Sequence, residues 1–346
     1  MSRLDERLDA VYRIGGGSGA NRVGFTPEED EAHRLVAGWL AEAGLEVEVD
    51  ANGNLLGRLR GEEPELPEVW SGSHLDSVPQ GGRYDGPLGV LAALEAVERL
   101  GRRRRTLGVV AFRDEERGCA GSRGRVASAE LPGAFVELHH EQGPRLHDAG
   151  APLAVVSGIV GYVRGERVFE GRAGHAGTTP MEGRDDALVA AAAEILRVRD
   201  VARSIAGAVA TVGRLEVEPG GTNVIPGRVR FTVDARAPDD ARVRELASRL
   251  ELDASRAVPA AVFGGPPVDA LRAAIEARGL PLVELFSGAG HDAGVLASAG
   301  VPSAMLFVRA GAGGVSHSPD ETAAPEDVAL ALDVLADALD RLASAR

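Results

Sequence analysis

The sequence predicts an α/β protein in which a mostly parallel mixed sheet flanked by helices is interrupted by a smaller α+β domain. Two observations lead to this prediction. From Val69 to about Arg145, short apolar runs alternate with helix-like segments, which is typical of a parallel sheet with helices on its faces. Between roughly Gly158 and Gly264 the order becomes strand, helix, strand, strand, helix, the ferredoxin-like plan. We therefore expect residues 1–157 and 265–346 to form one domain and residues 158–264 to form an inserted one.

The first sixty residues are expected to be scaffold. They indicate a helix, a glycine-rich loop at Gly15–Gly19, a second helix and a strand pair. The second helix is expected to begin at Thr26, because a threonine followed by a proline and acidic residues is a typical helix start, and to end at Gly44. Asn52-Gly53 is a typical hairpin turn between the two strands.

The other expected elements follow from the spacing of apolar residues. Pro87, well placed at a first helical position, is followed by apolar residues at three- and four-residue spacing up to Gly101, which predicts a helix. Apolar runs predict further strands of the first domain at 106–112, 134–138 and 303–308, and a helix at 268–279. The inserted domain is expected to have strands at 162–170, 208–217 and 229–235, helices at 185–201 and 239–252, and a last short strand near 260–263.

Composition and charge exclude several classes of protein. With 44% hydrophobic and 26% charged residues the chain is globular. The net charge of −14 argues against nucleic acid or an anionic membrane surface as a partner. No segment has the length and apolarity of a membrane span, and the N-terminus lacks the apolar core of a signal peptide. Cys119 is the only cysteine, so neither an intrachain disulfide nor a cysteine-based metal site is expected, and a cytoplasmic protein follows.

A candidate metal site begins in the stretch Ser71–Gly86, SGSHLDSVPQGGRYDG. His74 comes just after an apolar run, and Asp85 lies directly before the expected helix, whose positive dipole end favours an ionised, cation-binding carboxylate. Asp76 is placed to accept the other ring N–H of a metal-bound His74. The alternative is that His74 caps a strand and both aspartates are turn residues, since this short motif is a weak signal by itself.

Four further candidate ligands lie just past the carboxyl ends of apolar runs, where open α/β sheets place their sites. They are Glu115, Glu116, His139 and His317. The last of these is separated from its run at 303–308 by a glycine-rich loop. Because chance does not readily place so many donors at one edge, the convergence favours a metal site more strongly than any single motif.

Six nitrogen and oxygen donors exceed what one four-coordinate zinc ion needs, and they suit two metals about 3.5–4 Å apart that share a carboxylate. Asp85 is the expected bridge. Because Glu115 and Glu116 are neighbours on an extended segment, they point different ways. One is expected to bind a metal, while the other acts as general base towards a water whose pKa the metals lower towards ~7. Histidine and carboxylate ligands suit zinc, manganese, cobalt or nickel.

Several segments taken together resemble a known family. They are SGSHLDSVPQGGRYDG, FRDEERG, ELHHEQG, GHAGTTPMEGRDDAL, GTNVIPG, the triplet Asp234-Ala235-Arg236, SGAGHDA and SHSPDE. In this order, from about Gly24 to Pro325, they resemble the N-carbamoyl-L-amino acid amidohydrolases. These dinuclear metal hydrolases include allantoate amidohydrolase and β-ureidopropionase, and they share a clan with aminoacylase and carboxypeptidase G. The resemblance implies a zinc exopeptidase-like catalytic domain and an inserted lid domain through which two subunits form a homodimer.

The resemblance also implies a role for each candidate ligand. One divalent ion would be held by His74, Asp85 and His139, and the other by Asp85, Glu116 and His317. Glu115 would be the general base. His140 stands where the family usually has an aliphatic residue, and His291 sits in a glycine-rich loop whose backbone is expected to matter more than its ring. Neither of these two histidines is assigned a ligand role.

Four residues are similar to the family's substrate-binding residues. His175 looks like the histidine that stabilises the developing negative charge on the substrate carbonyl, often delivered from the partner subunit's lid. Arg236 looks like the fork for the substrate carboxylate. Gln142 and Asn223 are similar to residues that hydrogen-bond the carboxylate or the ureido group. The alternatives are a loop histidine, a surface arginine at a strand end and, for Asn223, a turn residue.

The activity that the resemblance implies is metal-dependent hydrolysis of a linear C–N amide bond. The expected substrate is an N-carbamoyl-L-amino acid, or a related ureido acid such as allantoate, whose carbamoyl group leaves as CO₂ and ammonia. The alternatives are an aminoacylase or dipeptidase on the same scaffold and a catalytically silent binding protein on a hydrolase fold. Between Leu250 and Val268 the chain is shorter than the family's usual lid exit, which predicts a stunted last lid strand and an altered dimer surface.

Overall fold

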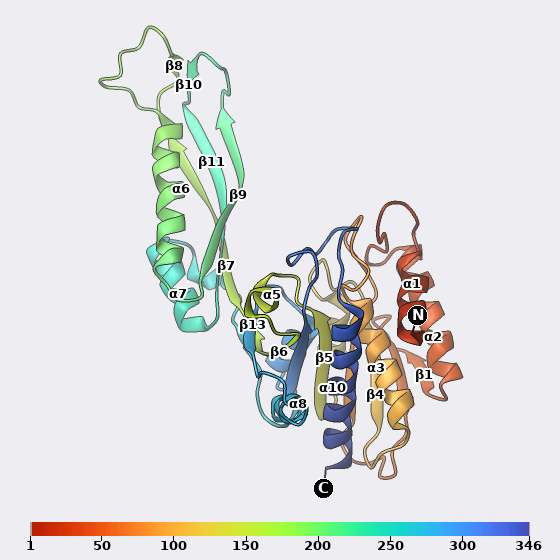
Figure 1. Cartoon of the computed structure of the whole chain (residues 1–346). Coiled ribbons are helices and arrows are strands. Elements are labelled where there is room, and N and C mark those ends of the chain that lie inside the picture. The colour runs from red at the N-terminus through yellow and green to blue at the C-terminus, as the bar shows by residue number, and fades with distance from the viewer. Residues whose placement is uncertain (1, 346) are drawn as a thin grey trace. The chain divides into compact units, whose positions relative to one another are not determined.

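A computed structural model describes residues 2–345 of the chain (Figure 1). The described residues form two compact units, one that runs up to Ile159 and resumes at Val262, and one formed by Val160–Ala261. The first unit is therefore built from both ends of the chain, and Figure 1 shows its blue elements packed beside its orange and yellow ones. None of the helices in residues 2–345 is long and apolar enough to cross a membrane.

A mixed sheet forms the centre of the first unit. Its strands are β1 (Glu46–Val49), β2 (Leu55–Leu59), β3 (Val69–His74), β4 (Leu107–Phe112), β5 (Ala134–His140), β6 (Leu153–Ile159), β12 (Ala261–Val262), β13 (Glu284–Ser287) and β14 (Ser303–Val308). In the described part of the chain these nine strands have the order β1-β2-β4-β3-β5-β14-β6-β12, with β13 also paired to β6. The centre of the sheet is parallel from β4 through β3 and β5 to β14, whereas β2 and β6 flank it in antiparallel pairs.

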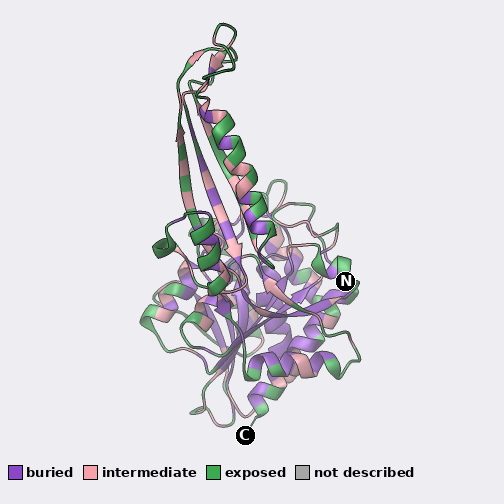
Figure 2. Ribbon diagram, turned by 90° about the vertical axis from the view of Figure 1, so that its left-hand side faces the viewer, coloured by how far each residue is buried: buried purple, intermediate pink, exposed green. Residues whose placement is uncertain are grey.

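Burial explains how these strands look in the sequence. β3, β4, β5 and β14 are buried along their whole length, so they read as continuous apolar runs rather than as alternating patterns. In Figure 2 the buried residues, in purple, gather in this sheet and on the inner sides of the surrounding helices. The expected mostly parallel sheet flanked by helices is confirmed.

Helices cover the sheet. They are α1 (Arg3–Tyr12), α2 (Pro27–Glu42), α3 (Pro87–Leu100), α4 (Ala120–Ser128), α5 (Arg145–Ala149), α8 (Pro266–Glu276), α9 (Asp292–Ser298) and α10 (Pro325–Ser344). α10 packs against both α3 and α8, while α4 and α9 pack against each other. α3 is buried from Pro87 to Val97, because its apolar residues meet β3 and β5 on one side and α10 on the other.

The second unit holds an antiparallel sheet of the order β7-β11-β9. Its elements are β7 (Gly161–Glu170), α6 (Ala187–Arg203), β9 (Val209–Glu218), β11 (Arg228–Ala237), α7 (Asp240–Arg249) and a 3-10 turn at Ala254–Arg256. α6 and α7 pack on the sheet around a core that includes Val198, Phe231 and Leu246. β8 (Gly174–His175) and β10 (Val224–Ile225) form a separate two-stranded ribbon.

The last expected strand of the inserted domain does not complete this sheet. The strand predicted near 260–263 is present as β12, but it joins the large sheet of the first unit, so its assignment to the ferredoxin-like plan was wrong. At the edge beside β7 the described residues show one isolated bridge, between Tyr162 and Val258. The physical reason is that the connection between α7 and β12 is short and contains a 3-10 turn. It therefore has no room for a further strand beside β7.

Candidate metal centre

The candidate ligands gather at one edge of the large sheet. His74 is the last residue of β3, and His139 is the last but one of β5, which runs two residues further than the sequence indicated. Because these strands are parallel, their carboxyl ends meet at the same edge. Glu115 and Glu116 follow β4 there, and His317 follows β14 after a loop.

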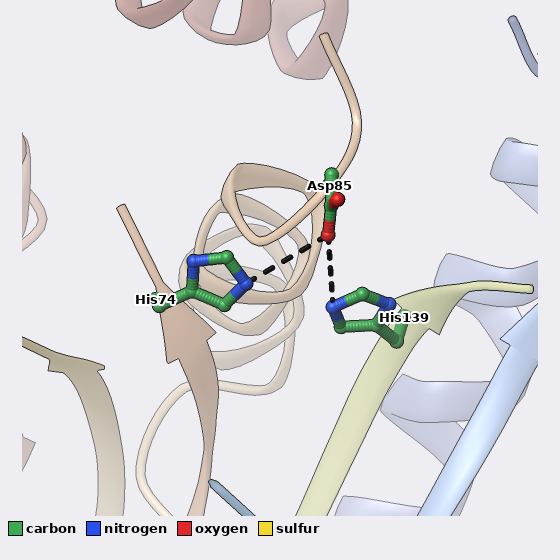
Figure 3. Close-up of side chains that lie close together, drawn as sticks. All are labelled: His74, Asp85 and His139. Atoms are coloured by element: carbon green, nitrogen blue, oxygen red, sulfur yellow. Dashed lines mark ion pairs between the residues drawn. The ribbon is translucent and has the colours of Figure 1, made fainter. Parts of the chain in front are cut away.

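Asp85 lies between two histidines in the first group of donors (Figure 3). Its Oδ1 is 3.8 Å from Nε2 of His74 and 3.4 Å from Nε2 of His139. All three side chains are buried, and one donor atom from each lies within 4.8 Å of the others. Bonds from zinc to nitrogen or oxygen are about 2.0–2.2 Å long, so donors at these separations can share one ion.

The other oxygen of Asp85 faces a second group. Its Oδ2 is 3.2 Å from Nε2 of His317, and that nitrogen is 3.4 Å from Oε2 of Glu116. These three donor atoms also lie within 4.8 Å of one another. Asp85 thus offers one oxygen to each group, which is the arrangement of a carboxylate that bridges two ions.

Unpaired buried atoms show that this donor set fits metal ions. Nε2 of His139 and Oε1 of Glu116 are buried without a hydrogen-bond partner. Because buried polar atoms are nearly always paired, two such atoms among facing donors indicate a site for a ligand. Imidazole nitrogens and carboxylate oxygens without a thiolate are suited to zinc, manganese, cobalt or nickel.

Hydrogen bonds orient both buried histidines. Nδ1 of His74 lies 3.2 Å from Oδ1 of Asp76, so a proton on Nδ1 leaves the lone pair of Nε2 free to bind a metal ion on the side that faces Asp85. Nδ1 of His139 lies 2.9 Å from the backbone carbonyl of the next residue, with the same result. Asp76 also accepts the backbone N–H groups of residues 115 and 116 over 3.1 and 3.2 Å, and therefore holds the turn that follows β4.

The carboxylates of the centre differ in their pKa values. Burial raises the pKa of Glu115 well above its usual range, against the lowering effect of His74. Burial and the negative charge of Asp85 raise the pKa of Glu116 to about 7. For Asp85 itself, burial is outweighed by the hydrogen bond with His317 and by the other histidines, which hold its pKa well below the usual range. Environments that push neighbouring carboxyl pKa values apart divide the roles of anion and proton carrier between them.

Unusual backbone conformations accompany the candidate ligands. Asp114, Gln142 and His317 adopt left-handed conformations with φ of 52°, 59° and 54°. Non-glycine residues in this region are uncommon, and they cluster at functional sites. Gly86 has φ of 82°, and a Cβ there would lie 2.5 Å from the His74 ring, so only a glycine allows α3 to begin so close to this histidine.

Two further residues lie next to the donors. Gln142 donates from Nε2 to Oδ2 of Asp85 over 2.8 Å, which places this candidate substrate-binding residue beside the second group. The ring of His291, which was expected to matter less than its backbone, meets the His139 ring edge-on at 4.4 Å and pairs through Nε2 with the Ser287 hydroxyl. The side chain of His291 therefore packs against the first group of donors.

Sequence reasoning missed two buried acids. Glu137 accepts the Ser73 hydroxyl over 2.7 Å and the backbone N–H of Ala293 over 2.9 Å, and so ties β3 and α9 to β5. Glu321 accepts backbone N–H groups of the loop that carries Asp85. Glu321 is the last residue of the segment SHSPDE, so the motif that marked the site was the available signal for it.

His175 and Asn223 lie together at one end of the second unit. The ribbon of β8 and β10 pairs His175 with Val224, and the backbone N–H of Ala176 donates to the carbonyl of Asn223 over 2.9 Å. Nδ1 of the exposed His175 accepts the backbone N–H of Gly177 over 3.0 Å, which leaves Nε2 for an outside partner.

Arg236 lies near the other end of β11, where it pairs with Tyr162 of β7. Its Nε donates to Oδ1 of Asp234 over 2.8 Å, and Nη2 donates to Oδ2 over 3.2 Å. The eight steps along the strand from Arg228 to Arg236 extend over roughly 26 Å. One copy of this unit therefore presents His175 and Arg236 at well-separated places.

A mixed α/β sheet with two linked groups of histidine and carboxylate donors at its carboxyl edge is characteristic of metal-dependent hydrolases. The sequence profile described as Peptidase family M20/M25/M40 matches residues 70–341, and the chain belongs to this family. It is therefore a hydrolase, and the family expected from the motifs is confirmed.

Individual relatives agree with this placement. The chain is 37% identical to the N-carbamoyl-L-amino acid amidohydrolase of Geobacillus stearothermophilus, with 96% of each chain covered. It is 34% identical to the probable allantoate deiminase of Oryza sativa subsp. japonica, over 93% of this chain and 84% of that protein. Its structure matches the crystal structure of an amidase of the hydantoinase/carbamoylase family from Burkholderia multivorans with a TM-score of 0.91 and 32% identity, covering 99% of this chain and 97% of that one.

Proposed function

We propose that this protein hydrolyses the carbamoyl amide bond of an N-carbamoyl-L-amino acid, or of a related ureido acid such as allantoate, with release of CO₂ and ammonia. The observation that carries the proposal is the Asp85 carboxylate, which directs Oδ1 to one group of donors and Oδ2 to another. The relatives named for carbamoyl amino acids and allantoate support the class of substrate.

The proposed cofactors are two divalent ions, zinc or else manganese, cobalt or nickel. The first would be held by His74, Asp85 and His139 and the second by Asp85, Glu116 and His317. These are two of the three sets of donors, among the described residues, that lie within 4.8 Å of one another, and they are the two that share Asp85. When bound, such ions supply Lewis acidity, which polarises a substrate carbonyl and lowers the pKa of water.

Glu115 is the proposed general base. Its Oε2 lies 3.8 Å from Nε2 of His74, beside the first donor group but outside it. Because burial raises its pKa, the carboxylate readily takes the proton of the attacking water and releases it again to the departing nitrogen. Asp76 holds this residue in place through its backbone N–H.

The substrate carboxylate is proposed to pair with Arg236, whose planar fork matches both oxygens. Asp234 already holds two of the guanidinium nitrogens and so fixes the direction of the fork. His175 would stabilise the negative charge that develops on the carbonyl, and Asn223 and Gln142 would hydrogen-bond the carboxylate or ureido group. Since one copy separates His175 from Arg236 by far more than the length of a ureido acid, we propose that the two come from different subunits.

A homodimer through the second unit supplies that second subunit. Val189 and Leu196, seven residues apart on α6, are 66% and 52% exposed, and Val209 and Leu215 on β9 are also exposed. β9 is an edge strand in the described part of this sheet. Exposed apolar side chains next to an unpaired strand edge favour association with a second copy.

The proposed partners are small molecules, and the proposed location is the cytoplasm. The net charge of −14 disfavours nucleic acid and anionic membranes. The single cysteine, Cys119, is buried and free, which suits a reducing compartment.

Ammonia release by the metal-reconstituted protein tests the proposed function. The panel contains N-carbamoyl-L-amino acids, N-carbamoyl-β-alanine and allantoate. N-acetyl-L-amino acids and dipeptides are the substrates of the rival activities, and because their hydrolysis releases no ammonia, it is followed by the free amino acid that it produces. We expect ammonia from at least one ureido acid and no comparable hydrolysis of the others. Preferred hydrolysis of an acetylated or dipeptide substrate would favour an aminoacylase or dipeptidase, and no turnover of any substrate would favour a silent binding protein.

A further inference from the structure

Glu321 is fully buried beside the candidate centre although it belongs to neither group of donors. Its Oε1 accepts the backbone N–H groups of Tyr84 and Asp85, over 2.7 and 3.1 Å. Its Oε2 accepts the hydroxyl of Ser316 over 2.7 Å. One carboxylate thus ties the loop that carries Asp85 to the loop that carries His317.

Gly82 makes room for this carboxylate. A Cβ at Gly82 would lie 2.1 Å from Cδ of Glu321, so the carboxylate packs directly on the backbone of the loop three residues before Asp85. Since the clashing atoms are the far end of a flexible side chain, an alanine at this position would displace the carboxylate rather than the backbone.

The two groups of donors depend on this contact to different degrees. In the first group, His74 and His139 are strand residues, and the hydrogen bonds of β3 and β5 to their neighbours fix them. In the second group, His317 lies in a loop, has a left-handed backbone and keeps a half-exposed side chain. Its position depends on loop contacts, and the bond from Ser316 to Glu321 is next to it in the chain.

We propose that Glu321 is a positioning residue for the second group of donors. It holds Asp85 and His317 at the separation at which Oδ2 and Nε2 bind the same ion, and it does not touch the substrate. The inference rests on the dinuclear centre proposed above.

Titration of the metal-free protein with Mn²⁺ tests this role, because it measures each binding event without an activity assay. For Glu321→Ala we expect the first equivalent to bind as in the wild type and the second to bind about 10- to 100-fold more weakly, as is typical when a residue that orients a ligand is removed. Glu321→Gln keeps an acceptor for the two backbone N–H groups and a donor for Ser316, so it is expected to restore most of the second affinity.

Asp327→Ala is the matched control. Asp327 is a buried carboxylate six residues further along the chain, and it pairs with Arg309, directly after β14, rather than with Ser316 or with the loop of Asp85. We expect this variant to keep both equivalents. Far-UV circular dichroism of each metal-free variant establishes that the chain is folded.

Gly82→Ala disturbs the same contact, between the Glu321 carboxylate and the loop of Asp85, without changing Glu321. This variant should bind the second equivalent of Mn²⁺ more weakly, although every donor and Glu321 itself are present. The double variant Gly82→Ala/Glu321→Ala should bind the second ion no more weakly than Glu321→Ala alone, because both changes act on one contact.

Three results would overturn the inference: wild-type binding of the second equivalent by Glu321→Ala, parallel loss of both equivalents in a folded variant, or the same selective loss in Asp327→Ala. Failure of the proposed function gives a different result. If the wild-type protein binds fewer than two equivalents, the dinuclear centre is wrong whatever the variants do.

Discussion

At the scale of single residues, neighbouring carboxylates of the centre differ because their surroundings differ. Asp85 faces histidines on both sides, which favour its ionised form, while Glu115 is buried and has a raised pKa. An anion that holds cations and a carboxylate that exchanges a proton therefore lie within one small site. The sequence allowed both residues to be singled out, but their division of labour depends on distances that only the fold supplies.

Glu115→Gln tests the proposed base. The amide keeps the size of the side chain but cannot take a proton, so we expect kcat to fall by roughly 10²–10⁴-fold. Metal content should not change, because Glu115 lies outside both groups of donors. Equal turnover by the variant and the wild-type protein would remove Glu115 from this role.

Arg236→Ala tests the proposed carboxylate fork. A hydrogen bond to a charged group contributes about 1.5–3 kcal/mol, so KM for carboxylate substrates should rise about 10- to 100-fold. Arg236→Lys keeps the charge but loses the fork, and it should recover only part of the loss. Steady-state kinetics on the best ureido acid check this, and an unchanged KM in the alanine variant would place the arginine outside the substrate site.

At the scale of elements, parallel strands explain why distant motifs meet. Runs such as β4 and β14 are buried on both faces, so the sequence shows them clearly, and parallel strands deliver the residues after them to one edge. Contacts between segments far apart in the chain have no comparable pattern in the sequence. The sequence did not reveal that Glu321 binds the loop of Asp85, 236 residues away, or that β12 pairs with the large sheet. A pairing partner is a property of the whole fold, whereas an apolar run is local.

α2 supplies a prediction of pH dependence through His33. Burial, together with the positive charge of Arg113, lowers the pKa of His33 to about 3. In the unfolded chain His33 has a pKa of about 6.5, so below this pH it binds a proton there but not in the folded chain. The free energy of unfolding therefore falls as the pH falls from about 6.5 towards 3. Between pH 6.5 and pH 5 the free energy of unfolding should fall by about 2 kcal/mol through this histidine.

Urea unfolding of the metal-free protein at pH 7 and at pH 5 measures this loss. His33→Gln should lose less stability over this interval than the wild type, while His147→Gln, which changes an exposed histidine, should behave like the wild type. An identical loss in wild type and His33→Gln would assign the acid sensitivity to other groups.

At the scale of the whole molecule, the two compact units divide the proposed work. The first unit carries the candidate metal ligands, and the second carries three of the four candidate substrate-binding residues and the exposed apolar surface of α6 and β9. The change of element order near residue 158 is the feature of the sequence that predicted an inserted domain at 158–264. Which residues of the inserted unit lie far apart could not be read in this way, because it depends on the length and register of β11.

Leu196→Glu tests the proposed homodimer. A charge on the exposed face of α6 would oppose burial against a second copy, so we expect sedimentation velocity to show a monomer in place of a dimer. Because His175 of the partner subunit is proposed to complete the site, activity should fall with the dimer. Arg244→Glu, a charge change at an exposed position of α7 and so outside the proposed surface, is the control. A wild-type monomer that is fully active would contradict the shared site.

The claim on which the account depends is that one carboxylate, Asp85, serves two metal ions at once. Electron paramagnetic resonance of the protein loaded with two equivalents of Mn²⁺ measures this directly, because ions bridged at about 3.5–4 Å are magnetically coupled. We expect a coupled signal in the wild-type protein that disappears in Asp85→Ala. A simple six-line signal from isolated ions at two equivalents in the wild-type protein would contradict the account.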